Sequence, residues 1–197
     1  MSWNVLVVPE DPTNNGYLLR PLCRRLLREA GRPNANIVVL PEPKVQGYFH
    51  AKKLLEDRIP RDWWHFELIL FICDADGLAA SRKDEFKRLE QLARERTRPV
   101  PLICCAAEQE LETWLLSGHP EKLKDLGEHW QKIRAEVSVK ERFFDPFLEK
   151  HGDPATPSQG RERLMQEALK NYDGMKRRCP ELQELENRIR ALIANLS

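Results

Sequence analysis

The sequence has no long apolar run, and no stretch approaches the roughly eighteen apolar residues that a membrane-spanning helix needs. It has no excess of charge either, since 32 Lys and Arg face 31 Asp and Glu and leave a net charge of +1. This balance is unlike that of a polybasic nucleic-acid coat or an acidic disordered tail. The N-terminus lacks a basic region and reaches Glu10 and Asp11 too early for a signal peptide. We therefore expect a globular protein of 197 residues with no membrane contact.

Paired cysteine and histidine motifs are also absent. The five cysteines form no CxxC pair, and the five histidines form no HxH or HExxH group, which argues against a structural zinc site. Cys73 and Cys104 fall in apolar, strand-like runs, so we expect buried, reduced thiols in a cytoplasmic protein. No P-loop, GxGxxG or Ser-His-Asp grouping is found, so nucleotide hydrolysis and dinucleotide redox chemistry are poorly supported.

The sequence does contain a regular alternation of apolar runs and amphipathic segments over residues 1–117. The strand-like runs are residues 5–8, 37–40, 68–73 and 100–105. The helical segments are residues 16–30, 49–57, a third that Ser81 could cap, and 108–116. Such alternation predicts an α/β domain with a four-stranded, mainly parallel sheet flanked by helices, in a Rossmann-like arrangement.

Residues 118–197 differ from the first part because their pattern is helical throughout. Residues 151–160 (HGDPATPSQG) form a loop by composition, and the helices after it end in one with a clear apolar face. We expect this region to be a helical C-terminal extension that packs on the α/β core.

Acidic residues follow two of the strand-like runs. Asp74 and Asp76 come after the most apolar run, and Glu10 and Asp11 come after the first. The carboxyl ends of parallel strands share one edge, where open α/β sheets bind ligands, and a DxD pair offers the hard oxygen donors that Mg²⁺ or Mn²⁺ prefers. If the first and third strands are neighbours, Glu10 approaches the pair, and three converging carboxylates repel one another without a cation. The alternative is a polar turn with Glu10 solvated.

Three further glutamates, Glu108, Glu110 and Glu112, follow the fourth run. In a helix over 108–116, Glu108 and Glu112 would share a face at i and i+4, whereas Glu110 would not. These acids are additional candidates for the site, although a helix N-terminus also favours anions through its dipole alone.

The motifs, in this order, resemble the Toprim-like family, and within it a group of small prokaryotic Toprim-related proteins that read EGPTE, then DxD, then QExExW. The matching segments are EDPTN at 10–14, DAD at 74–76, QELETW at 109–114 and GRERL at 160–164, followed by Tyr172, Lys176 and Cys179-Pro180. The resemblance covers nearly the whole chain.

This resemblance implies metal-dependent phosphodiester chemistry on nucleic acid, DNA rather than RNA. Carried over by position, Glu10 would act as general acid or base, and Asp74 and Asp76 would hold Mg²⁺ or Mn²⁺. Glu112, close to the tryptophan of the third motif, would be the leading additional acid at the site.

Two residues depart from the family pattern. Asp11 replaces the glycine after the first glutamate, and Asn14 replaces the second acid of EGPTE, and both changes weaken the catalytic interpretation more than the fold. They leave open a non-catalytic interaction module on a Toprim scaffold. A DxD phosphatase of the haloacid-dehalogenase type is a third reading, although its DxD normally follows the first strand.

A nuclease also needs cations that hold phosphates. The candidates are Lys52, Arg161, Arg163 and Lys176, of which the last three follow the loop at 151–160 and could close over the site. A net charge of +1 predicts modest non-specific affinity for nucleic acid. By analogy with Toprim nucleases of the overcoming-lysogenization-defect class, the resemblance suggests a partner ATPase and a role in defence against phage or plasmids.

Overall fold

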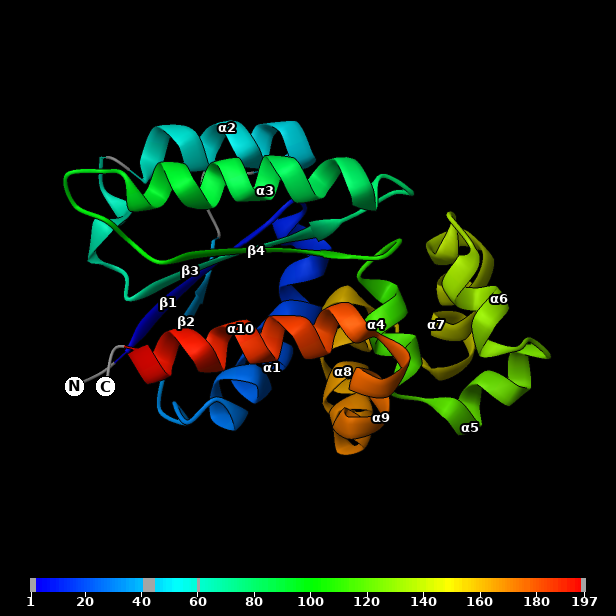
Figure 1. The fold of residues 1–197 in the computed structure, drawn as a ribbon. Helices are drawn as coiled ribbons and strands as arrows, with labels where there is room; N and C mark the ends of the chain where they lie inside the picture. The colour runs from blue at the N-terminus through cyan, green and yellow to red at the C-terminus, as the bar shows by residue number, and fades with distance from the viewer. Residues whose placement is uncertain (1–2, 41–44, 60, 196–197) are drawn as a thin grey trace.

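Figure 1 shows the computed structural model of the chain, which describes residues 3–40, 45–59 and 61–195. Its centre is a sheet of four strands in the spatial order β2-β1-β3-β4, and every neighbouring pair is parallel. The strands are β1 (Asn4–Pro9), β2 (Asn36–Val39), β3 (Leu68–Asp74) and β4 (Leu102–Ala107). The predicted α/β fold with a four-stranded parallel sheet is therefore confirmed.

The two central strands are apolar on both faces, as a parallel sheet that is covered on both sides requires. Residues 5–9 of β1 and residues 68–73 of β3 are all buried. Because side chains alternate along a strand, Val7 joins the hydrophobic cluster on one face and Val8 joins the cluster on the other. The continuous apolar runs in the sequence therefore reflect burial on two sides.

Helices cover both faces of this sheet. The elements are α1 (Pro12–Glu29), α2 (Tyr48–Arg58), α3 (Ala79–Arg94) and the last helix, α10 (Pro180–Asn195). Helices α2 and α3 lie on one face, and α1 and α10 lie on the other (Figure 1). Since crossover helices run back against parallel strands, the first turns of α1, α2 and α3 lie at the carboxyl edge of the sheet.

The rest of the chain forms short helices, most of them beyond the carboxyl edge of the sheet (Figure 1). They are α4 (Glu112–Ser117), α5 (Pro120–Leu123), α6 (Trp130–Ala135), α7 (Asp145–His151), α8 (Arg161–Ala168) and α9 (Tyr172–Arg178), with the 3₁₀ or π-helical turns η1 (Trp63–His65), η2 (Lys124–Leu126), η3 (Lys140–Phe144), η4 (Pro157–Gly160) and η5 (Leu169–Asn171). Their fully buried residues, including Trp114 and Phe144, belong to the same cluster as α1 and the sheet face beneath it. Residues 118–197 thus share a core with residues 1–117.

Two predicted helix starts were wrong. Helix α1 begins at Pro12 rather than at residue 16, because Asp11 caps it by accepting the Thr13 N–H at 2.8 Å and proline suits the first helical turn. Ser81 does not cap α3: it lies inside the first turn, and its Oγ donates to the Leu78 carbonyl at 2.9 Å.

The fourth predicted helix was too long at its start. Helix α4 begins at Glu112, and residues 108–111 form a bend in which the Gln109 carbonyl accepts the N–H groups of Ala75 and Asp76. These hydrogen bonds to the end of β3 hold the bend out of helical geometry. Glu108 and Glu112 therefore do not share a helical face.

All five cysteines are unpaired and buried, as expected from the sequence. Burial raises the pKa of the Cys23 thiol to about 12, so this group is a small apolar side chain at neutral pH. Within the described ranges, no helix has the length and apolar character needed to cross a membrane.

Candidate functional site

At the carboxyl ends of β1 and β3, the connections that leave the two strands run in opposite directions along the sheet. From β1 the chain crosses to β2, and from β3 it crosses to β4, on the opposite side of the sheet. Open α/β sheets bind ligands at such a switch point. Glu10 follows β1 directly and Asp74 ends β3, and the register that pairs Pro9 with Ile72 brings their carboxyl groups into a hydrogen bond.

The contact between Glu10 and Asp74 requires a proton. Burial raises the pKa of Asp74, and the hydrogen bond and negative charge of Glu10 raise it further. Burial is also the main cause of the raised pKa of Glu10. The Leu111 N–H donates to Asp74 Oδ1 at 2.7 Å and fixes the position of this carboxyl. At neutral pH the Asp74 carboxyl therefore keeps its proton and donates it in a hydrogen bond to Glu10.

Asp76 occupies the mouth of the same edge without joining this pair. The residue has a left-handed backbone with φ of 48°, and Gly77 follows with φ of 75°. This turn ends the strand, so the alternation that would place residues 74 and 76 on one side is lost. The Asp76 side chain is half exposed, and its Oδ2 lies 4.0 Å from Arg82 Nη2.

Glu112 lies close enough to Asp74 for its charge to act on that carboxyl. It is only 4% exposed, and its negative charge contributes to the raised pKa of Asp74. Burial raises the pKa of Glu112 itself, while the positive charges of Lys140 and Arg161 act in the opposite direction. An electrostatic link therefore joins α4 and the C-terminal helices to the carboxyl edge.

The other two glutamates of the third motif are separated. Glu110 is half buried and accepts the Lys140 N–H at 2.6 Å, and burial raises its pKa to about 7. Glu108 is half exposed and forms an ion pair with Arg134. The structure thus brings Glu110 and Glu112 toward Asp74 and Asp76, while Glu108 points to another surface.

The two departures from the EGPTE pattern have structural roles. Asp11 has an extended backbone with φ of −127°, which any residue adopts, so the missing glycine does not strain the turn. Asn14 donates to Asp11 Oδ2 at 3.4 Å and accepts the Ser158 hydroxyl at 3.3 Å. Asn14 therefore attaches the loop at 151–160 to the start of α1, a contact that the acid of the family pattern would also allow.

Two of the predicted phosphate-binding cations lie close to this edge. Lys52 forms an ion pair with Glu85 at 3.0 Å on the side of α2 and α3. Arg161 is 7% exposed, donates to the Ser158 carbonyl at 3.1 Å and lies over the ring of Phe144 at 5.1 Å. The loop at 151–160 thus places a buried guanidinium near Glu112.

The other two cations are engaged elsewhere. Arg163 donates to the His151 carbonyl at 2.7 Å and forms an ion pair with Glu167. Lys176 contacts the buried Glu186 at 3.1 Å and Asp173 at 3.3 Å. The structure does not bring these two side chains to the Glu10–Asp74 pair.

Arg82, in the first turn of α3, was not among the site residues predicted from the sequence. It is 6% exposed and lies on the buried stripe that continues with Phe86, Leu89 and Ala93. An arginine at a position where helical spacing calls for an apolar residue was the signal that could have identified it. Its charge lowers the pKa of Glu10, so it belongs to the electrostatics of this edge.

The donor set at this edge suits a hard divalent cation. Carboxylate oxygens are the ligands that Mg²⁺ prefers, and proteins often hold this ion through one or two carboxylates, with waters and substrate phosphate completing the shell. Glu10 and Asp74 supply two such carboxyls, which lie within hydrogen-bonding reach of each other. Among the described residues, no group of three or more His, Cys, Asp or Glu side chains is arranged as a metal cage.

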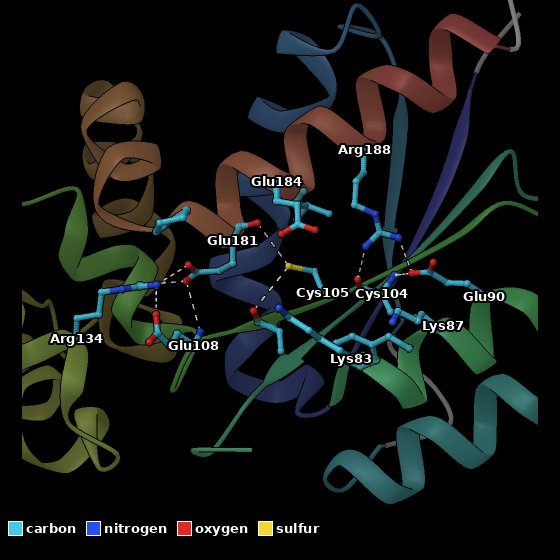
Figure 2. A pocket seen from close by; sticks show the side chains of 14 residues that line it. Lys83, Lys87, Glu90, Cys104, Cys105, Glu108, Arg134, Glu181, Glu184 and Arg188 are labelled. Atoms are coloured by element: carbon cyan, nitrogen blue, oxygen red, sulfur yellow. Dashed lines mark hydrogen bonds and ion pairs between the residues drawn. The ribbon is translucent and has the colours of Figure 1, made fainter. Parts of the chain in front are cut away.

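A cavity of about 690 Å³ lies elsewhere, along the outer side of β4 between α3 and α10 (Figure 2). Arg188 donates to the Cys104 carbonyl at 2.8 Å, and Glu90 accepts the Cys104 N–H at 2.9 Å. Arg188 and Glu90 also form an ion pair at 2.6 Å, so side chains satisfy the open edge of the sheet. Glu108 lines this cavity, whereas Glu10 and Asp74 do not.

No family model, no curated protein and no solved structure matches the chain. The resemblance to Toprim-like proteins therefore stays a prediction from the sequence motifs.

Proposed function

We propose that this protein is a Mg²⁺- or Mn²⁺-dependent phosphodiesterase that cleaves nucleic acid, with DNA as the favoured substrate. The observation that supports this proposal is the hydrogen-bonded Glu10–Asp74 pair at the switch point between β1 and β3. Two buried carboxylates repel one another unless a proton or a cation lies between them, and such pairs at the ligand-binding edge of a sheet are typical of functional sites.

Each acid has a distinct role in this proposal. Asp74, held by the Leu111 N–H, would be the fixed ligand of the cation, and Asp76, which is more exposed, would reach it from the mouth. Glu10 would hold or accept a proton at its carboxyl, since a carboxyl with a raised pKa is better suited to proton transfer near neutral pH. When bound, the divalent ion would stabilise negative charge on the phosphate and orient the attacking water.

The biological setting is part of the same proposal. The net charge of +1 predicts weak non-specific binding to DNA, so a partner ATPase would supply additional affinity in a cytoplasmic defence system.

The test is cleavage of plasmid DNA by the purified protein in Mg²⁺ or Mn²⁺, together with calorimetry of metal binding. We expect metal-dependent nicking that Glu10→Gln and Asp74→Asn abolish, and metal binding that Asp74→Asn removes. Asp84→Asn is the matched control, because Asp84 is an exposed acid on α3 whose ion pair with Lys87 is on the surface.

Other outcomes would favour the alternatives. A folded protein that binds no divalent metal would refute the enzyme and favour a non-catalytic module on this scaffold. Metal-dependent hydrolysis of p-nitrophenyl phosphate without cleavage of DNA would favour a phosphatase that uses the same acids.

A further inference from the structure

Arg82 is a buried cation that contacts the Tyr48 hydroxyl and leaves one of its donors unused. Only 6% of the residue is exposed, yet its Nε has no hydrogen-bond partner among the residues that the structure describes. Its ion pairs are long: Nη1 lies 3.9 Å from Glu85 and Nη2 lies 4.0 Å from Asp76. Charge-assisted hydrogen bonds of arginine are typically about 2.7–2.9 Å, so neither carboxylate fully engages the guanidinium.

A dedicated set of side chains holds this guanidinium in place. Arg82 lies over the ring of Tyr48, 3.3 Å from its centre, and Tyr48 donates its hydroxyl to Glu85. Lys52 donates to the other oxygen of Glu85 at 3.0 Å, and these contacts lower the pKa of Glu85. Glu85 is thus ionised and accepts hydrogen bonds from Tyr48 and Lys52, while the Tyr48 ring packs against the guanidinium of Arg82.

The cluster faces the carboxyl edge of the sheet. The Gly47 N–H, just before α2, donates to the Glu10 carbonyl at 3.0 Å and ties the start of α2 to the end of β1. The positive charge of Arg82 lowers the pKa of Glu10, and the half-exposed Asp76 lies 4.0 Å from Arg82 Nη2. An anion that arrives from solvent would displace the loose contact with Asp76 and meet Arg82 beside the Glu10–Asp74 pair.

We propose that Arg82 is the phosphate-binding residue of this site and donates hydrogen bonds to the non-bridging oxygens of a phosphodiester that lies between it and the Glu10–Asp74 pair. The inference deepens the proposed function and rests on it for the substrate class. Its physical basis is the planar fork of arginine, which matches two phosphate oxygens, and the burial that strengthens such an interaction. Lys52 acts indirectly in this arrangement, by neutralising Glu85.

The test measures binding of inorganic phosphate and of a short DNA duplex by calorimetry in EDTA, so that it does not depend on metal. We expect wild-type protein to bind phosphate, Arg82→Lys to bind it about tenfold more weakly, and Arg82→Met to show no saturable binding. Lys83→Ala is the matched control, because this neighbouring cation lies on the exposed side of α3 and should change nothing. Near-UV circular dichroism reports whether each variant is folded; if Arg82→Met unfolds, Arg82→Lys decides, because it keeps the charge and loses only the fork.

The outcomes separate this inference from the proposed function. Binding of phosphate that depends on Arg82, in a protein that never cleaves DNA, supports the inference and counts against the nuclease. If a folded Arg82→Lys variant cleaves DNA with the KM of the wild type, the inference is overturned and the proposed nuclease activity is retained. The protein could bind the duplex and not free phosphate. If Arg82→Lys weakens this binding of the duplex, the inference is supported, and the phosphate it recognises belongs to the nucleic-acid backbone.

Discussion

Replacing Asp74 with asparagine should make the metal-free protein more stable at neutral and alkaline pH. The carboxyl of Asp74 is buried against Glu10, and its pKa is raised above the 3.8 of an unperturbed aspartate. Between those two values the folded state binds more protons than the unfolded state, so the free energy of unfolding falls as pH rises. Asparagine is neutral, similar in shape and able to accept the Leu111 N–H, and therefore removes this penalty.

The magnitude follows from the size of the pH window. At pH 7 the unfolded chain has released the proton of Asp74, whereas the folded chain retains it. The interval from the unperturbed pKa of 3.8 to pH 7 is about 3 pH units. At about 1.36 kcal/mol per unit, the penalty reaches about 4 kcal/mol. Asparagine keeps only part of the hydrogen bonding to Glu10, so we expect a gain of roughly 2 kcal/mol at pH 7 and little change at pH 4.

The assay is urea unfolding followed by circular dichroism at several pH values from 4 to 8. Asp76→Asn is the matched control, because this carboxylate is half exposed and its removal should change stability by less than about 0.5 kcal/mol. Mg²⁺ at about ten times its Kd should stabilise the wild type by roughly 1.4 kcal/mol and should not stabilise Asp74→Asn. Wild-type stability that rises between pH 5 and 8, or an Asp74→Asn variant less stable than wild type at pH 8, would refute the reasoning.

Two further predictions concern the fold and are measured by the same urea unfolding. Gly118→Ala should cost about 3 kcal/mol, because the added Cβ would lie 2.4 Å from the Ala168 Cβ, whereas Gly16→Ala has its nearest atom at 3.7 Å and should be neutral or stabilising; equal effects would contradict this. Asp11→Ala should cost about 1 kcal/mol by removing the cap of α1, and Asp11→Ser should restore most of it; a serine variant as unstable as the alanine one would rule out capping.

The sequence located the strands closely because burial on two faces leaves a local trace. The apolar run at 68–73 matches β3, which is one residue longer at its end, and the run at 5–8 lies within β1. Helix starts were less accurate: a local hydrogen bond from the Thr13 N–H to Asp11 sets the start of α1, whereas the start of α4 depends on hydrogen bonds to a distant strand. The bend at 108–111 shows this, because the end of β3 holds it in place and no local pattern records that contact.

The candidate site was more predictable in its central acids than in its cations. Glu10 and Asp74 stand directly after apolar runs, so parallel topology alone directs them to one edge. The partners of a long basic side chain depend on which helices pack together. Lys176 therefore contacts Glu186 rather than the carboxyl edge, and Arg82 lies at that edge although its sequence neighbours suggest an ordinary surface helix.

The sequence by itself determined the class of fold and the edge at which acids gather, because periodicity and strand ends are local properties of the chain. Only the tertiary structure decided that β1 pairs with β3, and this pairing brings Glu10 into contact with Asp74. It also decided that α10 covers the sheet beside α1, so that both parts of the chain share one core. Strand order and helix docking depend on which apolar faces bury one another across long separations, and a local pattern specifies a face without specifying its partner.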